Sequence, residues 1–401
     1  MSGVVIIGAG HAAGQAAASL RQAKYEGDIT IIGDEAHIPY QRPPLSKAYL
    51  KGEQSADKVY LRAESFYADR NITMKLNTTA TAIDTAAKTV ALNTDETLSY
   101  DHLLISTGSR PRRLSIEGSD LPGIHYLRTM DDVDGLRDGM RPDANLVIVG
   151  GGYIGLEVAA VGRELGMDVH VLEMEERILQ RVTTPQMSAY YHQLHQGRGV
   201  HIHTSTGVTG FAGDGKVEEV ICGDQRFAAD IVIVGIGIIA NTELAEAAGI
   251  HCDNGIVVDE HCRTSDPFVY AAGDCTNHPN PLLDRRLRLE SVPNAMDQAR
   301  VSTANMLGDE KTYAAIPWFW SDQYELKLQM VGFSADGDTQ VLRGDMASNQ
   351  FAVFYLKDGK VVAADAVNSP KEFMLCKQLV GKPADLALLA DPESDLKALL
   401  A

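Results

Sequence analysis

The sequence predicts an α/β protein with two doubly wound units and a separate α+β region at its C-terminal end. Two glycine-rich turns, 142 positions apart, carry this prediction: Gly8-Ala9-Gly10 and Gly150-Gly151-Gly152. Each turn follows an apolar strand and opens a helical segment, which is the arrangement of a βαβ unit in a parallel sheet. The last stretch, residues 315–401, has both tryptophans and alternating strands but no such turn.

The length and charge of the chain limit what it can be. Its 401 residues exceed one ordinary domain, so two or three are expected. A formal net charge of −18 argues against a nucleic-acid binder, which needs a cationic surface. The longest apolar run, residues 231–240, is too short to span a membrane. Because a strand begins by Val4, there is no room for a signal peptide, and we expect a soluble cytoplasmic protein.

The first part of the chain reads as a βαβ unit, a proline-rich segment and a group of strands. Residues 4–35 follow the order strand, glycine turn, helix, strand. Residues 38–47 contain three prolines, which predict an extended segment followed by a short helix. Residues 72–108 alternate apolar and polar side chains, as β-strands do, and end in Ser106-Thr107-Gly108.

A second βαβ unit follows, and the chain then returns to the first. Residues 109–113, rich in Pro and Arg, predict a linker, and the second unit covers residues 146–173. An apolar strand at residues 231–235 closes this unit, and a later strand ends in Gly273-Asp274. We therefore predict three domains: residues 1–110 with 235–314, residues 111–234, and residues 315–401.

The glycines of such turns have separate tasks. The first makes a tight turn, the second lets the backbone approach a pyrophosphate, and the third lets the helix pack closely on the strand. The pyrophosphate binds free N–H groups at the helix N-terminus, where the helix dipole favours negative charge. Two such turns therefore predict Rossmann-like domains for two nucleotide cofactors, between which a hydride can move.

The second turn has the features of an NADH site. Glu173 ends the second strand of its unit, 18 residues after Gly155. A carboxylate there accepts hydrogen bonds from both ribose hydroxyls and repels a 2′-phosphate, which favours NADH over NADPH. Glu175 and Glu176 strengthen that repulsion, with Arg177 as the nearby cation. The residues expected to bind NAD are Gly150, Gly152, Ile154, Gly155, Glu173 and Gly237.

The first turn is less regular. Ala13 occupies the position of the third glycine, Gly14 follows it, and Asp34 is the acid after the second strand. Its place at the start of the chain, together with Gly273-Asp274 far later, matches the way flavoproteins hold FAD. Two NAD sites, or turns without a ligand, are the alternatives.

Five motifs occur together in this chain: Pro43-Pro44-Leu45-Ser46-Lys47, Ser106-Thr107-Gly108, Gly150 to Glu157, Gly273-Asp274 and Trp318-Phe319-Trp320-Ser321-Asp322-Gln323. Their combination resembles the FAD-dependent NADH:ferredoxin reductases of the putidaredoxin reductase and biphenyl dioxygenase type. The resemblance covers essentially the whole chain. It implies the glutathione-reductase-like pair of domains, one for FAD and one for NADH, and a C-terminal interface domain. It also implies a [2Fe–2S] ferredoxin as partner, serving a cytochrome P450 or a ring-hydroxylating oxygenase.

The resemblance also implies roles for single residues. Lys47 is expected close to the reactive nitrogen of the flavin, with Glu157 as its ion-pair partner, because a buried lysine needs one to stay charged. Trp320 is expected beside the flavin, on the route to the acceptor. An exposed lysine and an ordinary buried tryptophan are the alternatives. The expected FAD contacts are Gly8, Gly10, Ala12, Ala13, Asp34, Lys47, Ala80, Arg128, Asp274 and Val292.

The cysteines and histidines argue against two other chemistries. Five scattered cysteines, without any Cys-x-x-Cys spacing, predict free thiols, and none lies between Pro39 and Lys47, where disulfide reductases have a redox-active pair. His192 and His195 lie three apart, and His201 and His203 lie two apart, but no carboxylate or cysteine completes a metal site, so no metal is expected.

Several cations are candidates for steering an acidic ferredoxin, although a solvated surface without a partner is the alternative. A rubredoxin reductase or NADH oxidase of the same fold is a rival function. A redox-sensing interaction protein like apoptosis-inducing factor is a rival of another class. The cations are Arg62, Arg285, Arg286, Arg288, Arg300 and Lys327.

Overall fold

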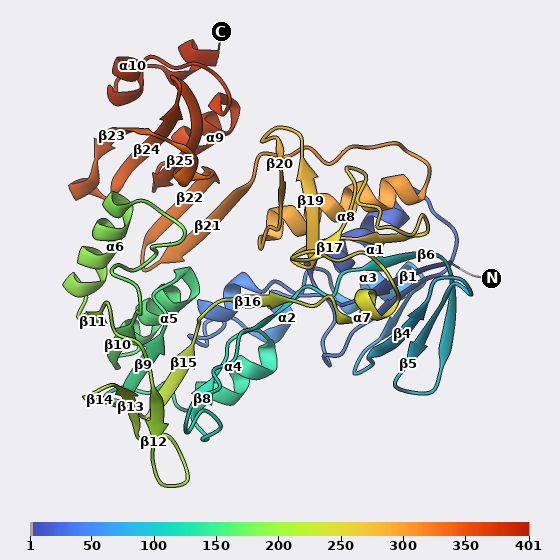
Figure 1. Ribbon diagram of the computed structural model, residues 1–401, viewed down its shortest axis with the longest axis horizontal. Coiled ribbons are helices and arrows are strands. Elements are labelled where there is room, and N and C mark those ends of the chain that lie inside the picture. Colours follow the sequence, from blue (N-terminus) through green and yellow to red (C-terminus); the bar gives the residue numbers. More distant parts are fainter. Residues whose placement is uncertain (1–2, 401) are drawn as a thin grey trace. The chain divides into compact units, whose positions relative to one another are not determined.

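The computed structural model describes residues 3–400, and its backbone groups into two compact units (Figure 1). The first unit comprises the chain up to Arg42 with residues 55–110 and 238–317. The second comprises residues 43–54, residues 111–237 and the chain from Trp318 onward. The C-terminal region thus groups with the inserted segment, and the division into three domains stays a prediction.

The first unit is built on a mainly parallel sheet with the strand order β3-β2-β1-β6, to which β18 adds on the far side of β6. Val4 and Ile6 of β1 face one apolar cluster, which includes helices α1 and α8, and Val5 and Ile7 face the other. This alternation follows from the two-residue period of a strand. Helices α1 and α8 pack side by side on one face (Figure 1).

The strands of this unit are β1 (Gly3–Ile7), β2 (Ile29–Ile32), β3 (Ile72–Lys75), β4 (Ala80–Asp84), β5 (Thr89–Leu92), β6 (Thr97–Ile105), β7 (Ser109–Pro111), β16 (Ile238–Ala240), β17 (Ile256–Val257), β18 (Val269–Ala271), β19 (Thr276–Asn280) and β20 (Arg285–Leu287). Its helices are α1 (His11–Gln22), α2 (Ala56–Val59), α3 (Glu64–Asp69), α7 (Glu243–Ala247) and α8 (Val292–Met306).

The second unit contains a parallel sheet in the order β11-β10-β9-β15-β8 and an antiparallel sheet in the order β21-β22-β25-β24-β23. The parallel strands are β8 (Ile124–His125), β9 (Asn145–Val149), β10 (Asp168–Leu172), β11 (Val200–His203) and β15 (Ile231–Val234). The antiparallel strands are β21 (Trp318–Gln323), β22 (Leu326–Gly332), β23 (Thr339–Asp345), β24 (Gln350–Lys357) and β25 (Lys360–Val367). A meander of β12 (Gly210–Ala212), β13 (Glu219–Cys222) and β14 (Gln225–Ala228) completes the strands.

The helices of the second unit are α4 (Met130–Arg137), α5 (Tyr153–Glu164), α6 (Pro185–Gly197), α9 (Pro370–Leu379) and α10 (Leu386–Ala390), with 3₁₀ turns η1 (Pro43–Ser46), η2 (Ser334–Asp336), η3 (Met346–Ser348) and η4 (Leu396–Leu400). The predicted fold class is confirmed: two βαβ-based parallel sheets and a C-terminal α+β region. Between residues 3 and 400, no helix has both the length and the apolar character that crossing a bilayer requires.

One expectation for the proline-rich segment is wrong. Pro43 and Pro44 do not continue an extended stretch but open the 3₁₀ turn η1. Proline suits the first turn of a helix because its fixed φ matches and its missing N–H is not needed there. The N–H of Lys47 closes the turn by donating to the carbonyl of Pro44, at 3.0 Å.

Candidate dinucleotide sites and a buried ion pair

The first glycine of each turn is required by the backbone. Gly8 and Gly150 have φ values of +103° and +109°, which side-chain-bearing residues rarely adopt. A Cβ on Gly8 would lie 2.2 Å from the carbonyl oxygen of Ser106, and one on Gly150 would lie 2.4 Å from that of Gly235. Both turns are therefore as tight as the sequence predicts.

The second glycine of each turn faces open space. Gly10 and Gly152 are the N-cap residues of α1 and α5, and no side chain caps either helix. A Cβ built on either glycine would meet no protein atom within 4 Å. The helix N-termini therefore present free N–H groups to a space that a side chain would fill, which fits a pyrophosphate in both units.

The third positions differ in a way that the structure explains. In the second unit a Cβ on Gly155 would lie 2.3 Å from the carbonyl oxygen of Gly150, so the helix packs closely on the turn. In the first unit Ala13 is fully buried, and the tight approach falls one residue later. A Cβ on Gly14 would lie 2.9 Å from Cβ of Pro39, so the proline segment packs on α1 there.

Glu173 lies at the glycine turn of the second unit. Its Oε2 accepts a hydrogen bond from the N–H of Gly151 at 2.7 Å, and its Oε1 accepts one from the N–H of Glu175 at 2.9 Å. Two apolar side chains beside the turn are exposed, Ile154 by 47% and Met174 by 74%. The carboxylate thus has a fixed place, and Met174 is a residue that the sequence reasoning did not single out.

In the first unit, Asp34 follows β2, but the neighbouring acid Glu35 makes more contacts. Asp34 is exposed, whereas Glu35 forms an ion pair with Arg42 at 2.7 Å and accepts a hydrogen bond from the Tyr40 hydroxyl. Arg42 also donates to the Tyr40 oxygen at 3.0 Å. Arg42 and Tyr40 were missed, although both lie in the proline segment that the sequence marked as unusual.

Three distant segments meet beside the first glycine turn. A Cβ on Gly273 would lie 3.8 Å from Cβ of Ala12 and 3.6 Å from Cβ of Ala295 in α8. Asp274 accepts a hydrogen bond from the Ser109 hydroxyl at 2.8 Å. Val292 begins α8 and Ala80 begins β4 in the same unit, whereas Lys47 and Arg128 belong to the second unit.

The expected ion pair between Lys47 and Glu157 is present. Nζ of Lys47 lies 2.6 Å from Oε2 of Glu157. The Ser46 hydroxyl donates to the same oxygen, and Nζ also donates to the carbonyl of Pro43 at 3.2 Å. The Glu157 side chain is only 5% exposed, and that of Lys47 is 20% exposed. Because the pair is buried to this degree, removing either side chain would leave the other charge without a partner and destabilise the fold.

A chain of buried polar groups continues from Glu157. Its Oε1 accepts a hydrogen bond from the Ser321 hydroxyl at 2.7 Å, and the Gln323 amide donates to Ser321 at 3.2 Å. Nε2 of His195 lies 2.8 Å from the amide oxygen of Gln323. Burial lowers the pKa of His195 to about 4, so the ring is neutral and donates from Nε2. The sequence assigned no role to Ser321 and Gln323, which alternate along a quoted motif, and His195 was considered only as a metal ligand.

Trp320 lies in β21 next to Ser321. Its ring centroid is 5.6 Å from that of Trp318, and both side chains are partly exposed. The placement of Trp320 beside a flavin stays a prediction.

The cysteines are unsuited to thiol chemistry. All five are free. Burial raises the pKa of Cys252 and Cys275 to about 11 and that of Cys262 to about 12. A redox-active pair needs an accessible thiolate, so none of these resembles one.

Most of the predicted partner-binding cations have partners within the chain. Arg286 donates to the carbonyl of Val258, while Arg288 and Arg300 form ion pairs with Glu290 and Asp297. Arg62 lies over the Phe66 ring, Arg285 is exposed in β20, and Lys327 is exposed in β22 of the second unit. Local acids thus reduce the positive charge that this set can offer.

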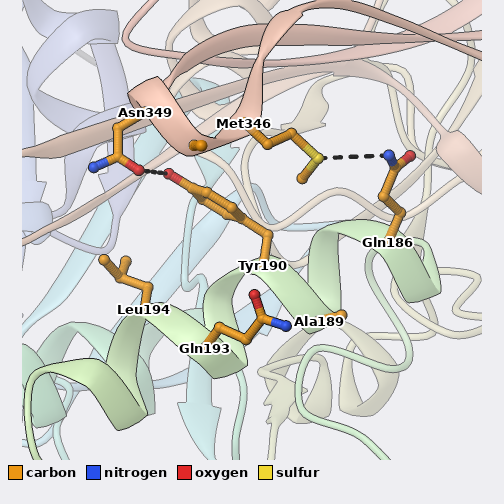
Figure 2. Close-up of a pocket in the computed structure, with 8 residues that line it drawn as sticks. Gln186, Ala189, Tyr190, Gln193, Leu194, Met346 and Asn349 are labelled. Carbon is orange, nitrogen blue, oxygen red and sulfur yellow. Dashed lines mark hydrogen bonds between the residues drawn. The ribbon is translucent and has the colours of Figure 1, made fainter.

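A pocket of about 500 Å³ lies between α6 and η3. Its lining residues are drawn in Figure 2. Tyr190 and Asn349 both line the pocket, and the Tyr190 hydroxyl donates a hydrogen bond to Oδ1 of Asn349 at 2.7 Å. Gln186, Gln193 and Met346 also line it. None of the predicted site residues lines this pocket, so it is separate from the glycine turns.

The structure corrects the expectation for His201 and His203. Residues Asp168 and His170 of β10 lie beside them, so a carboxylate does accompany the histidines. It could not be seen along the sequence because parallel pairing brings together residues more than 30 positions apart.

Comparison with known proteins agrees with the glycine turns. The sequence model described as pyridine nucleotide-disulphide oxidoreductase matches residues 2–299, and that of the reductase C-terminal domain matches residues 318–400. The chain belongs to this oxidoreductase family. Within it, the chain is a member of the putidaredoxin reductase-like ferredoxin reductases, as its relatives indicate.

Two relatives and one solved structure illustrate this membership. Putidaredoxin reductase CamA of Pseudomonas putida is 45% identical, over 99% of this chain and 96% of that protein. The ferredoxin–NAD(+) reductase component of the anthranilate 1,2-dioxygenase system of Burkholderia cepacia is 42% identical, over 99% and 98%. The crystal structure of the covalent putidaredoxin reductase–putidaredoxin complex matches this oxidoreductase with a TM-score of 0.96 and 45% identity, over 100% and 98% of the two chains.

Proposed function

We propose that this protein is an NADH-dependent ferredoxin reductase with bound FAD. Its acceptor would be a [2Fe–2S] ferredoxin that serves a cytochrome P450 or a ring-hydroxylating oxygenase. The names of the relatives support the reaction, and the geometry of the two glycine turns supports two dinucleotides. We further propose that it works in the cytoplasm.

The residues present fit the two cofactors. The turn at Gly8 and Gly10, with Asp274 and the start of α8 nearby, would hold FAD. The turn at Gly150 and Gly152, with the fixed carboxylate of Glu173, would hold NADH. The remaining expected contacts, Ala12, Ala13, Asp34, Lys47, Ala80, Arg128 and Val292 for FAD and Ile154, Gly155 and Gly237 for NAD, are part of the same proposal.

The observation that carries the proposal is the Lys47–Glu157 ion pair. Lys47 ends the proline-rich segment at residues 39–47, which contains no sulfur atom. Bound FAD would supply the chemistry, since a flavin accepts two electrons together and releases them singly. The chain would bind and orient its cofactors. Glu157, held by Ser321 and Ser46, would hold the Lys47 ammonium in place. The buried thiols argue against a disulfide as acceptor.

The experiment is an anaerobic stopped-flow comparison of acceptors. The FAD-loaded protein is reduced with NADH and mixed with a [2Fe–2S] ferredoxin, a rubredoxin, a small disulfide or oxygen. We expect the ferredoxin to be reduced fastest. Faster reduction of rubredoxin or oxygen would favour the rival functions of the same fold. A stable complex with NAD and no fast acceptor would favour a redox-sensing interaction protein.

Ionic strength gives a second test, of the partner surface. If Arg62, Arg285, Arg286, Arg288, Arg300 and Lys327 steer an acidic ferredoxin, added salt slows reduction of the ferredoxin but not of a small neutral dye. Equal slowing of both acceptors would contradict electrostatic steering.

A further inference from the structure

Three histidines and an aspartate lie together on one face of the parallel sheet in the second unit. His170 of β10 is the register partner of His201 in β11. Asp168 lies two positions before His170, and His203 lies two positions after His201. Because side chains alternate along a strand, all four project from the same face.

The ligand atoms of three of these residues lie close to the spacing that a metal ion requires. Nε2 of His201 lies 3.4 Å from Oδ1 of Asp168, and Nε2 of His170 lies 3.7 Å from Oδ2. One ligand atom from each residue can be chosen so that all lie within 4.8 Å of one another. Zinc bonds of about 2.0–2.1 Å in a tetrahedron separate ligand atoms by roughly 3.4 Å. Small side-chain shifts would therefore suffice to close the site.

The fourth residue, His203, contacts the other ring nitrogen of His170. Nδ1 of His170 lies 3.1 Å from Nε2 of His203, and their rings are nearly parallel, at 5°. If Nδ1 of His170 carries the proton of this hydrogen bond, the lone pair of Nε2 faces Asp168 and His201. Metal-bound histidines commonly donate their other ring N–H to such a partner. The Phe227 ring, 4.7 Å from that of His203, packs against this side of the group.

We propose that Asp168, His170 and His201 bind one divalent transition-metal ion of the zinc, copper and nickel class, with His203 as the positioning residue for His170. Two imidazoles favour these ions over Mg²⁺ and Ca²⁺, which take oxygen ligands. The side chains of Asp168 and His201 are 49% and 56% exposed, so the ion is reachable from solvent and keeps a position for water. The site is distinct from the glycine turn and from the Lys47–Glu157 pair.

The ion would join an edge strand to its neighbour. In the parallel sheet β11 pairs only with β10, and His201 and His170 belong to these two strands. An ion that binds the folded protein and not the unfolded chain stabilises the fold by RT ln(1 + [ion]/Kd), so the gain grows with the logarithm of the ion concentration. Added Zn²⁺ should therefore raise the thermal midpoint of the wild type.

The test uses the tag-free, FAD-loaded protein and ZnCl₂ in isothermal titration calorimetry. We expect one Zn²⁺ per chain, at least tenfold weaker binding in Asp168→Asn and in His201→Asn, and 10- to 100-fold weaker binding in His203→Phe. His251→Asn, which changes an exposed histidine of the first unit, is the matched control and should bind as the wild type does. Unchanged binding in both Asp168→Asn and His201→Asn, or equal loss in His251→Asn, would overturn the proposal.

A spectroscopic arm does not depend on how well the variants fold. The electron paramagnetic resonance spectrum of the wild type with one equivalent of Cu²⁺ should show hyperfine coupling to two imidazole nitrogens. A spectrum with no nitrogen coupling, or with aquo-copper alone, would reject the site.

Discussion

The hydroxyl of Ser321 donates a 2.7 Å hydrogen bond to Oε1 of Glu157. The two residues lie 164 positions apart, one in the C-terminal sheet and the other in α5. The opposite oxygen of the same carboxylate binds Lys47. The C-terminal sheet therefore holds in place the carboxylate with which Lys47 pairs.

Lys47→Met should reduce NADH-dependent ferredoxin reduction by more than tenfold and destabilise the protein by about 2–3 kcal/mol, because Glu157 would be left buried and unpaired. Lys51→Met is the matched control. Lys51 lies in the same segment and pairs with Glu53 and Glu164, whose side chains are 57% and 37% exposed, so its loss should cost under about 1 kcal/mol. Steady-state rates and thermal unfolding measure both. Equal behaviour of the two variants would contradict a special role for Lys47.

Two alanine substitutions in one turn should affect different properties, the first stability and the second NADH binding. Gly150→Ala should destabilise the protein by at least about 1–3 kcal/mol, since φ is +109° and a Cβ would lie 2.4 Å from the oxygen of Gly235. Gly152→Ala should leave unfolding nearly unchanged but weaken NADH binding, because its Cβ enters open space. Chemical denaturation and NADH titration separate the two effects. Tight NADH binding by Gly152→Ala would argue against a pyrophosphate at this position.

Glu173→Ser should shift cofactor choice toward NADPH. Removing the carboxylate at the turn removes its repulsion of a 2′-phosphate, and we expect the ratio of kcat/KM for NADPH over NADH to rise at least about tenfold. Glu176→Gln, an exposed acid of the same segment, should change the ratio far less. A ratio that stays constant in Glu173→Ser would place the choice elsewhere.

Trp320→Ala should separate the two half-reactions. If the ring lies on the route to the acceptor, reduction of a [2Fe–2S] ferredoxin slows more than reduction of bound FAD by NADH. Trp318→Ala, which removes the neighbouring ring on the same strand, is the control variant. Stopped-flow traces of each step decide it, and equal slowing of both steps would count against the role.

Asp365 should give stability an unusual pH dependence. Burial raises its pKa to about 6, while Tyr355 and Thr183 donate hydrogen bonds to its Oδ2. The charged form therefore costs stability above pH 6, and the cost disappears as pH falls from 6 towards 4. Relative to Asp365→Asn, which has no such titration, the wild type should gain roughly 3 kcal/mol over this range. Denaturation curves at pH 7, 6, 5 and 4 provide the measurement. A difference that does not change with pH would mean that Asp365 titrates normally.

The sequence predicted the fold well because the relevant signals are local. Glycine spacing, apolar strands and strand-terminal acids each lie within about 30 residues, which is the size of a βαβ unit. The Lys47–Glu157 pair was expected only through the family resemblance, since no local pattern links two residues 110 positions apart. The 3₁₀ turn at Pro43 was missed because proline fits both an extended segment and a first helical turn.

The groups that escaped prediction depend on tertiary pairing. His195 reaches Gln323 across the second unit, and Asp168 meets His201 through strand pairing. Glu35, rather than Asp34, pairs with Arg42. The direction of each side chain decides which of the two neighbouring acids forms the pair. Such contacts have no signature in residue spacing, because strand pairing and packing bring together partners that lie far apart along the chain.

Strand β21 restricts how this reductase can be recombined with its relatives. It carries Trp320 and Ser321 at successive positions, so the two side chains project from opposite faces. A one-residue insertion before Trp318 that shifted the strand would exchange these faces, removing the hydroxyl from Glu157 and the indole from its own position. Chimeras that take their C-terminal region from a relative must therefore keep Ser321 of β21 opposite Glu157 of α5. Otherwise the carboxylate that pairs with Lys47 loses this hydrogen bond.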